Sequence, residues 1–384
     1  MSLLKSLFSG KTGQTGAAHA ELPRHAPVAD AEQVDGLLVN AYATVRVLPA
    51  LDFPCAWAQA RDSSDPELAA HLNGFQGYVF ERSNIKTEGD KITRNALGFY
   101  LIQHIGAVKH QVSFVIDPAQ RERVSAWAAQ ANAVFYLPDG SICDPQWRVL
   151  IDAAGHSQSD AQVPHPADAL ARRARTLAAL AQRQIRALPN MPPVPGADEV
   201  ALRPAAEVMQ RALALVVVAA CGDLWASDGA PDLDWLRKIF PQGFSWLSPQ
   251  EQAFMADGQP EQSMISNMTW RYEALNLLLW ALGAVAGLSD GEPAHAPDLL
   301  KIMADLNRDA DAIGKAELRP AAEILDALDM TYRLHWTARE AQLGRGDAGA
   351  VNGDVIAERH TALNWLTGFQ NPPDVEWDQV DTPT

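Results

Sequence analysis

The feature that most constrains the fold is a series of apolar stripes with helical spacing between residues 198 and 369. Apolar residues recur there at intervals of three and four, which is the spacing of one face of an α-helix. Segments rich in Pro and Gly separate the stripes. The pattern predicts an all-helical domain. The expected helices span residues 198–224, 231–239, 249–257, 261–287, 297–307, 318–343 and 351–369. Ser248-Pro249-Gln250-Glu251 is a capping box with Pro at the first helical position, which predicts where the third of these helices begins.

Two of these helices contain long apolar runs, Ala212–Cys221 and Ala274–Leu288. Both runs are shorter than the roughly 18 to 20 residues that a membrane span needs, so they predict buried core helices. The opening MSLLKSLFSGKTG lacks the apolar core of a secretory signal. We therefore expect a cytoplasmic protein without a membrane-spanning segment.

The preceding part of the chain mixes short strand and helix patterns. Strands are predicted at 41–48, 77–81, 111–116, 133–137 and 147–151, and helices at 65–73 and 117–131. The expected fold class is α+β, with a small N-terminal α/β sandwich of four to five strands and helices on one face, followed by the larger all-α domain.

Four segments follow from these patterns: a flexible leader at 1–34, an α+β domain at 35–155, a linker with a basic helix at 156–196, and the all-helical domain at 197–384 with an extended C-terminal tail. The arginines of the basic helix are typical of a solvated face. They are also compatible with docking against the acidic C-terminal half or an acidic partner.

The negative charge lies in the C-terminal half. Residues 188–384 contain 13 basic and 29 acidic side chains, which accounts for the formal net charge of −16. This excess disfavours nonspecific binding to nucleic acids and to anionic membranes. Three dispersed cysteines, Cys55, Cys143 and Cys221, do not form a disulfide framework or a zinc motif. Phosphate-loop and nucleophile motifs are absent from the sequence. We expect no cofactor and no metal.

Ionisable residues occupy helix positions that the apolar stripes would bury. Arg339 falls within the stripe of the 318–343 helix, and Arg359 falls within that of the 351–369 helix. Burying an unpaired charge is costly, so these side chains should find partners between helices. We predict a polar network formed by Glu207, Arg211, Arg271, Glu273, Asp329, Arg333, His335, Arg339, Glu358 and Arg359.

Two interpretations of this network remain open. In the first, which we prefer, the residues are ion pairs that set the register of the helices. In the second, Arg271, Arg333 or Arg339 holds an anionic group in a pocket, and Glu273 or Glu358 acts as a base. His335 with Glu358 has no metal-ligand spacing, so we interpret His335 as a core histidine.

Several motifs occur in a fixed order along the helical half: ALRPAAEVMQRALAL, SPQEQAFM, MTWRYEALNLLLWALG, EILDALDMTYRLHWTARE, VIAERHTALNWL and WDQVDTPT. Over residues 160–384 this succession resembles the bacterial family known as domain of unknown function 4272. The resemblance implies a helical fold and supplies no activity, cofactor or catalytic residue. It places these residues within the family motifs: Arg271, Glu273, Asp329, Arg333, His335, Trp336, Arg359, His360, Asn364, Trp365, Trp377 and Asp378.

The leading functional hypothesis is a noncatalytic interaction or accessory protein with an unidentified protein partner. The alternative is an enzyme or small-ligand binder that uses the charged cluster to hold an anion. A third hypothesis is a toxin-neutralising or secretion-associated protein in competition between bacteria, since an acidic protein suits a basic toxin.

Overall fold

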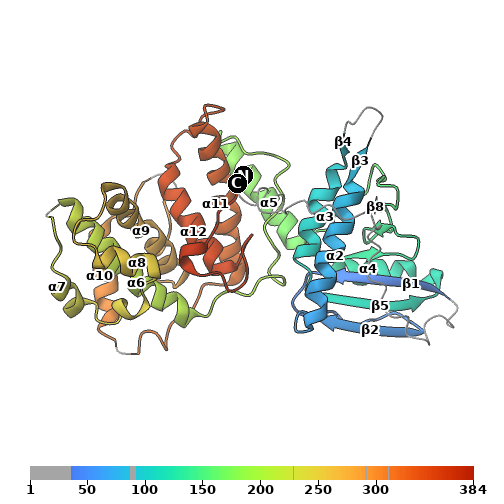
Figure 1. Cartoon of the computed structure of the whole chain (residues 1–384), viewed down its shortest axis with the longest axis horizontal. Coiled ribbons are helices and arrows are strands. Elements are labelled where there is room, and N and C mark those ends of the chain that lie inside the picture. The colour runs from blue at the N-terminus through green and yellow to red at the C-terminus, as the bar shows by residue number, and fades with distance from the viewer. Residues whose placement is uncertain (1–35, 87–91, 228, 290–291, 310) are drawn as a thin grey trace, which may run out of the picture. The chain divides into compact units, whose positions relative to one another are not determined.

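The computed structural model describes residues 36–86, 92–227, 229–289, 292–309 and 311–384. The predicted leader, residues 1–34, lies outside the described residues. The chain divides into two compact units, one that ends at Asp168 and one that starts at Ala169. Each unit has its own layers of secondary structure (Figure 1).

The first unit is built on a six-stranded antiparallel sheet in which β2, β5 and β1 lie side by side (Figure 1). The strand order is β2-β5-β1-β6-β7-β8. The strands are β1 (Leu37–Ala43), β2 (Trp57–Asp62), β5 (His110–Ile116), β6 (Ala133–Tyr136), β7 (Ile142–Cys143) and β8 (Val149–Ile151). A separate pair, β3 (Asn84–Lys86) and β4 (Ile92–Arg94), forms a small two-stranded antiparallel sheet. The α+β class is confirmed, with six strands in the main sheet instead of the expected four to five.

Helices cover both faces of this sheet, so the prediction of helices on one face is wrong. Ala41 and Phe135 share a core with Trp127 of α4 (Arg121–Ala131). The alternate residues Tyr42 and Val134 share another core with α2 (Pro66–Ser83) and α3 (Ala96–Gly106). Strands buried on both faces have nearly continuous apolar sequences, and that of β6, AVFY, has this character.

The segment 77–81, predicted as a strand, belongs to helix α2. Leu68, Phe75 and Val79 are buried at spacings of seven and four, which place them on one helical face against the sheet. Asp65 caps the helix by accepting a hydrogen bond from the Glu67 amide. The prediction for 117–131 is confirmed: Asp117 caps the short 3₁₀ helix η2 (Pro118–Gln120), and α4 follows directly.

The second unit consists of helices, and each of the seven predicted ones is present. They are α6 (Ala205–Ser227), α7 (Leu233–Ile239), α8 (Pro249–Ala256), α9 (Gln262–Ala281), α10 (Ala296–Asn307), α11 (Ala321–Gln342) and α12 (Gly353–Thr367). Helix α5 (Ala167–Gln182), which contains the basic stretch, precedes them. The 3₁₀ turns are η3 (Gly243–Trp246) and, within the tail expected to be extended, η4 (Trp377–Gln379). The predicted capping box of Ser248 and Glu251 is present at the start of α8.

Helices α6 and α9 form the centre of this unit, and the predicted core run Ala212–Cys221 is buried there. The second run is buried only as far as Ala281, and several residues after it are exposed, so the prediction of a core helix through Leu288 is wrong for its last part. Helix α9 ends at Ala281, earlier than expected, because Gly283 adopts a left-handed conformation with φ of 75° that ends helices. Among the described helices, α6 has the length and composition of a membrane-crossing helix, and 78% of its most apolar stretch is buried inside the protein.

Two glycines of the α2–α3 pair test this packing. An added Cβ on Gly98 would lie 1.9 Å from Ser83 Oγ and 2.5 Å from Ser83 Cβ, whereas Gly77 has open space. We expect Gly98→Ala to lower the free energy of unfolding by about 1–3 kcal/mol through overpacking. We expect Gly77→Ala, the matched control in an exposed helical position, to raise it by about 0.5–1 kcal/mol. Urea unfolding measures both values, and an equal effect of the two substitutions would contradict the close approach of α2 and α3.

Candidate functional site

Two ion pairs join α9 to α12 within the second unit. Arg359 Nη2 lies 2.9 Å from Glu273 Oε2, and each side chain is only 2% exposed. Nearer the surface, Arg271 Nη1 donates to both carboxylate oxygens of Glu358, at 3.2 and 3.0 Å. The two helices therefore meet in a register in which each contributes one cation and one anion.

Further hydrogen bonds complete the buried pair. Arg359 also donates to the carbonyl of Ser289, and the second carboxylate oxygen of Glu273 accepts from the Ala294 amide. These contacts draw the segment that follows α9 onto α12. Burial raises the pKa of Glu358 in spite of the neighbouring Arg271, whose charge lowers it.

Asp329 and Arg333 form a second fully buried ion pair within α11. Arg333 donates from Nε to Asp329 Oδ2 at 3.1 Å and from Nη2 to Oδ1 at 2.8 Å. The same Nη2 donates to the carbonyl of Pro192 at 3.2 Å. The bidentate contact with Asp329 neutralises both charges. The hydrogen bond to Pro192 holds the Pro-rich segment before α6 against α11.

His335 of α11 contacts His360 of α12, with 2.8 Å between the two Nδ1 atoms. One ring donates the shared hydrogen and the other accepts it, so at least one imidazole is neutral. Burial, with a smaller effect from the charge of Arg339, lowers the pKa of His335 to about 4. Burial also lowers the pKa of His360 well below its usual value. Both rings are therefore neutral at pH 7, as expected of core histidines.

Trp377, in the C-terminal segment, connects a further ion pair to this network. Arg211 of α6 pairs with the buried Glu251 of α8. The guanidinium carbons of Arg211 and Arg271 lie 5.0 and 5.7 Å from the Trp377 ring centroid, within cation–π range. Asp378 beside it accepts hydrogen bonds from Ser248 Oγ and the Gln250 amide, at 2.6 and 2.9 Å.

Two predicted members of the network lie elsewhere. Glu207 is partly exposed and pairs with Arg203, not with Arg211 one turn later on α6. Arg339, expected within the apolar stripe of its helix, is exposed in the last turn of α11. The prediction that Arg339 is buried is wrong because the buried face at this end of α11 is formed by Leu334 and Ala338, which pack against Val351 and Ile356. A cation is favourable there next to the helix C-terminus.

The sequence alone did not identify three members: Glu251, His360 and Arg203. The capping box already explains Glu251, and His360 lies off the apolar stripe of the 351–369 helix, so neither position indicates a network member. Arg203 precedes α6, donates to the carbonyl of Trp365 at 2.8 Å and lies 4.5 Å from the centroid of that ring. The helix predicted from residue 198 would include Arg203, whereas α6 begins at Ala205, so helical spacing could not indicate its contacts.

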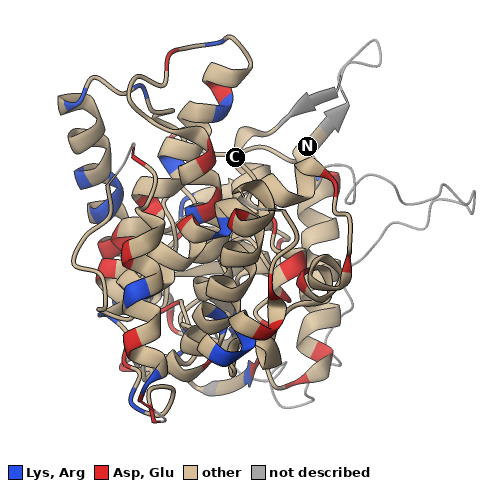
Figure 2. Cartoon of the chain, turned by 90° about the vertical axis from the view of Figure 1, so that its left-hand side faces the viewer, with Lys and Arg blue, Asp and Glu red and all other residues tan. Residues whose placement is uncertain are grey.

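The basic helix α5 packs against α11 through its arginines. Arg172 Nε and Arg175 Nη2 lie 3.1 and 2.9 Å from Asp326 Oδ1. Arg172 is buried and also donates to the carbonyl of Pro195. Acidic and basic residues both occur along the helices of this unit (Figure 2). The arginine run is therefore a docking face as well as a solvated one.

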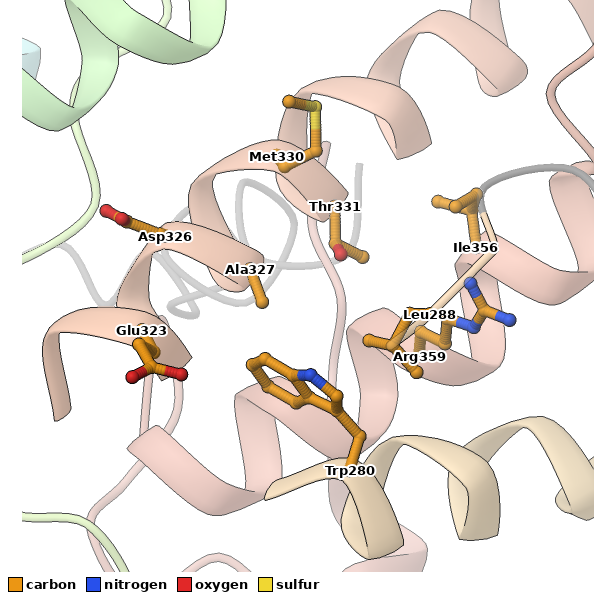
Figure 3. A pocket seen from close by; sticks show the side chains of 9 residues that line it. All are labelled: Trp280, Leu288, Glu323, Asp326, Ala327, Met330, Thr331, Ile356 and Arg359. Atoms are coloured by element: carbon orange, nitrogen blue, oxygen red, sulfur yellow. The ribbon is translucent and has the colours of Figure 1, made fainter. Parts of the chain in front are cut away.

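A cavity of about 340 Å³ lies beside the network. Glu323 and Asp326 border one end, Ile356, Leu288 and Arg359 border the other, and the Trp280 indole lies between them (Figure 3). Its lining residues are Trp280, Leu288, Glu323, Asp326, Ala327, Met330, Thr331, Ile356 and Arg359. The cavity combines an apolar interior with a carboxylate end.

The described residues contain no group of three or more His, Cys, Asp or Glu side chains arranged to hold a metal ion. Burial raises the pKa of the Cys143 thiol to about 11 and that of Cys221 to about 12. Both are therefore thiols at neutral pH, the unreactive form toward electrophiles.

The histidine pair predicts a pH dependence of stability. A depressed folded-state pKa means that stability falls as pH decreases through the unfolded value of about 6.5 toward the folded value. Each imidazole should contribute a slope of about 1.4 kcal/mol per pH unit within that window. We expect a His335→Asn and His360→Asn double variant to show a smaller slope between pH 6 and pH 4.5 in urea unfolding. Equal slopes for the variant and the unmodified protein would show that the rings are not held neutral.

Comparison with known proteins identifies the helical unit. The family model described as "Domain of unknown function (DUF4272)" matches residues 172–380, more than half of the chain. Neither a curated protein nor a solved structure matches the chain. The matched range begins within α5 and ends after η4, so it contains every ion pair described above in this unit. The chain therefore belongs to the DUF4272 family.

Proposed function

We propose that this chain is a noncatalytic interaction protein whose helical unit is a framework held by buried ion pairs. The observation that carries the proposal is the pairing itself: the buried guanidinium groups of Arg211, Arg333 and Arg359 each contact a buried carboxylate. A site for an anionic substrate would need a guanidinium that the substrate can reach. A substrate anion that displaced one of these carboxylates would leave that carboxylate buried and unpaired, at a cost of several kcal/mol.

Accessibility supports the same proposal. Glu273 is 2% exposed, and its two carboxylate oxygens accept from Arg359 and from the Ala294 amide. A base in that position cannot contact a substrate from solvent. Arg333 is fully buried on α11, with Asp329 and the Pro192 carbonyl as its acceptors.

The partner that fits the charge of this chain is a basic protein in the cytoplasm. Residues 188–384 contain 16 more acidic than basic side chains, and such an excess attracts cationic proteins and repels nucleic acids and anionic membranes. A basic toxin or a component of a secretion system is a narrower version of the same partner class.

A second candidate function is favoured by one observation. Arg271 and Glu358 are 17% and 19% exposed, and the pKa of Glu358 is raised by burial. A partly accessible acid with a raised pKa next to a cation is a common arrangement in active sites. In this alternative, Arg271 holds an anionic ligand and Glu358 transfers a proton.

Thermal unfolding of the full chain in the presence of metals, nucleotides and small carboxylates separates the two candidates. A ligand at a hundred times its Kd adds about 2.7 kcal/mol to stability, which raises Tm measurably. We expect no compound to raise Tm in a manner that depends on Arg271. The variants are Arg271→Gln and, as control, Arg308→Gln, which removes an exposed pair with Asp305.

A rise in Tm that is lost in Arg271→Gln and kept in Arg308→Gln would favour the ligand-binding alternative. The interaction proposal also requires a partner. Tagged full-length chain, cross-linked in cells of its source organism, should recover the same basic protein repeatedly, with recovery that falls as salt increases. Repeated failure to enrich any protein would count against the proposal.

A further inference from the structure

We infer that the cavity between α9, α11 and α12 binds an apolar group that carries an ammonium or guanidinium. This inference goes beyond the proposed function, because it assigns a ligand chemistry to the cavity beside the α9–α12 ion pairs. The volume of the cavity, about 340 Å³, lies at the lower end of the range for small-ligand sites. The cavity therefore suits one small molecule or one long side chain.

The body of the cavity is apolar. Trp280 lies at its centre, and Leu288, Met330 and Ile356 complete the apolar lining (Figure 3). A flat or aliphatic group of the ligand would remove these surfaces from water. At roughly 25 cal/mol per Å² of apolar area, such burial supplies affinity without selectivity for charge.

Selectivity for charge comes from two carboxylates at one end. Glu323 and Asp326 are three residues apart on α11, so they lie on one side of the helix, and their side chains are 49% and 48% exposed. Both lie on the same side of the cavity in Figure 3. Two carboxylates at one end of an apolar cavity favour a cationic head group.

The protein's own arginines show what these carboxylates bind. Arg319 Nη1 lies 3.1 Å from Oε2 of Glu323, while Arg172 and Arg175 share Oδ1 of Asp326. These contacts engage one oxygen of each carboxylate. The other oxygen of each, Glu323 Oε1 and Asp326 Oδ2, is the acceptor for the ligand.

The central aromatic ring favours the same ligand class. The guanidinium carbon of Arg319 lies 5.1 Å from the Trp280 ring centroid, so this indole already takes part in a cation–π contact. A ligand cation near the same ring would gain from the negative face of the indole. Carboxylate and indole together are a recurrent combination for recognition of organic cations.

An anionic ligand finds no partner of comparable quality in this cavity. Arg359 is the basic residue among the nine that line it, and its two terminal nitrogens donate to Ser289 and Glu273. The excess of acidic residues in this half of the chain adds to the preference for cations. Within the lining, two carboxylates against one paired guanidinium favour a cationic ligand over a small carboxylate or phosphate.

Three molecules of one shape test the inference: benzamidine, which is cationic, benzamide, which is neutral, and benzoate, which is anionic. Calorimetric titration of the full-length chain should give the highest affinity for benzamidine, at least tenfold above benzamide and benzoate. Equal affinity for benzamidine and benzamide, or no benzamidine binding at millimolar concentration, would overturn the inference.

Variants assign the binding to the cavity. We expect Glu323→Gln combined with Asp326→Asn to weaken benzamidine at least tenfold. We expect Glu340→Gln, which alters another arginine-paired carboxylate of α11, to leave the affinity unchanged. Ala327→Leu narrows the cavity without removing a charge and should also weaken benzamidine at least tenfold, so the inference stays testable if the double variant unfolds. Unchanged affinity in a folded double variant, or in folded Ala327→Leu, would overturn it.

The cation could be a free molecule or a side chain of a partner protein. Agmatine and the peptide acetyl-Gly-Arg-Gly-amide present the same guanidinium from these two sources. Displacement of benzamidine at a lower concentration of agmatine assigns the site to a free cation. Displacement at a lower concentration of the peptide assigns it to a partner side chain. This outcome is independent of the Arg271 experiment, so the two proposals can fail separately.

Discussion

The contact on which the helical unit depends most is the buried pair of Glu273 and Arg359. Removing two such ions from water costs several kcal/mol each, and the cost is offset only when both find partners in good geometry. Their separation of 2.9 Å therefore fixes the position of α12 against α9. Arg271 and Glu358 repeat the arrangement nearer the surface. Since these two helices frame one side of the cavity, its shape depends on the same pairs.

The remaining donors and acceptors draw distant segments of the chain onto this framework. Arg333 takes the Pro192 carbonyl as an acceptor, and Arg359 takes that of Ser289. Trp377 brings the C-terminal segment between α6 and α9 by contacting Arg211 and Arg271. These segments outside the helices therefore supply hydrogen-bond and cation–π partners for the buried arginines. The region matched by the family model includes Trp377.

Local patterns in the sequence predict most of the helices and strands. They predict few of the contacts between charged side chains. Helical spacing and the Ser248 capping box located the helices of the second unit. The strand predicted at 77–81 failed because aromatic and β-branched residues also occur on the buried face of α2. The apolar stripe of α12 identified Arg359 as buried, but which carboxylate meets which guanidinium depends on helix packing. For this reason the sequence does not identify Glu251 and His360 as members of the network, whereas Arg339 was misplaced because it lies off the buried face of Leu334 and Ala338.

A double-mutant cycle across Glu273 and Arg359 tests the central claim most directly. Glu273→Gln, Arg359→Gln and the double variant would be unfolded in urea, followed by far-UV circular dichroism. If the pair holds the helices in register, each single substitution leaves a buried unpaired charge, and the two substitutions are strongly coupled. We expect a coupling energy of about 2–3 kcal/mol, with the double variant less destabilised than the sum of the singles. Additive effects of the two substitutions would contradict the account.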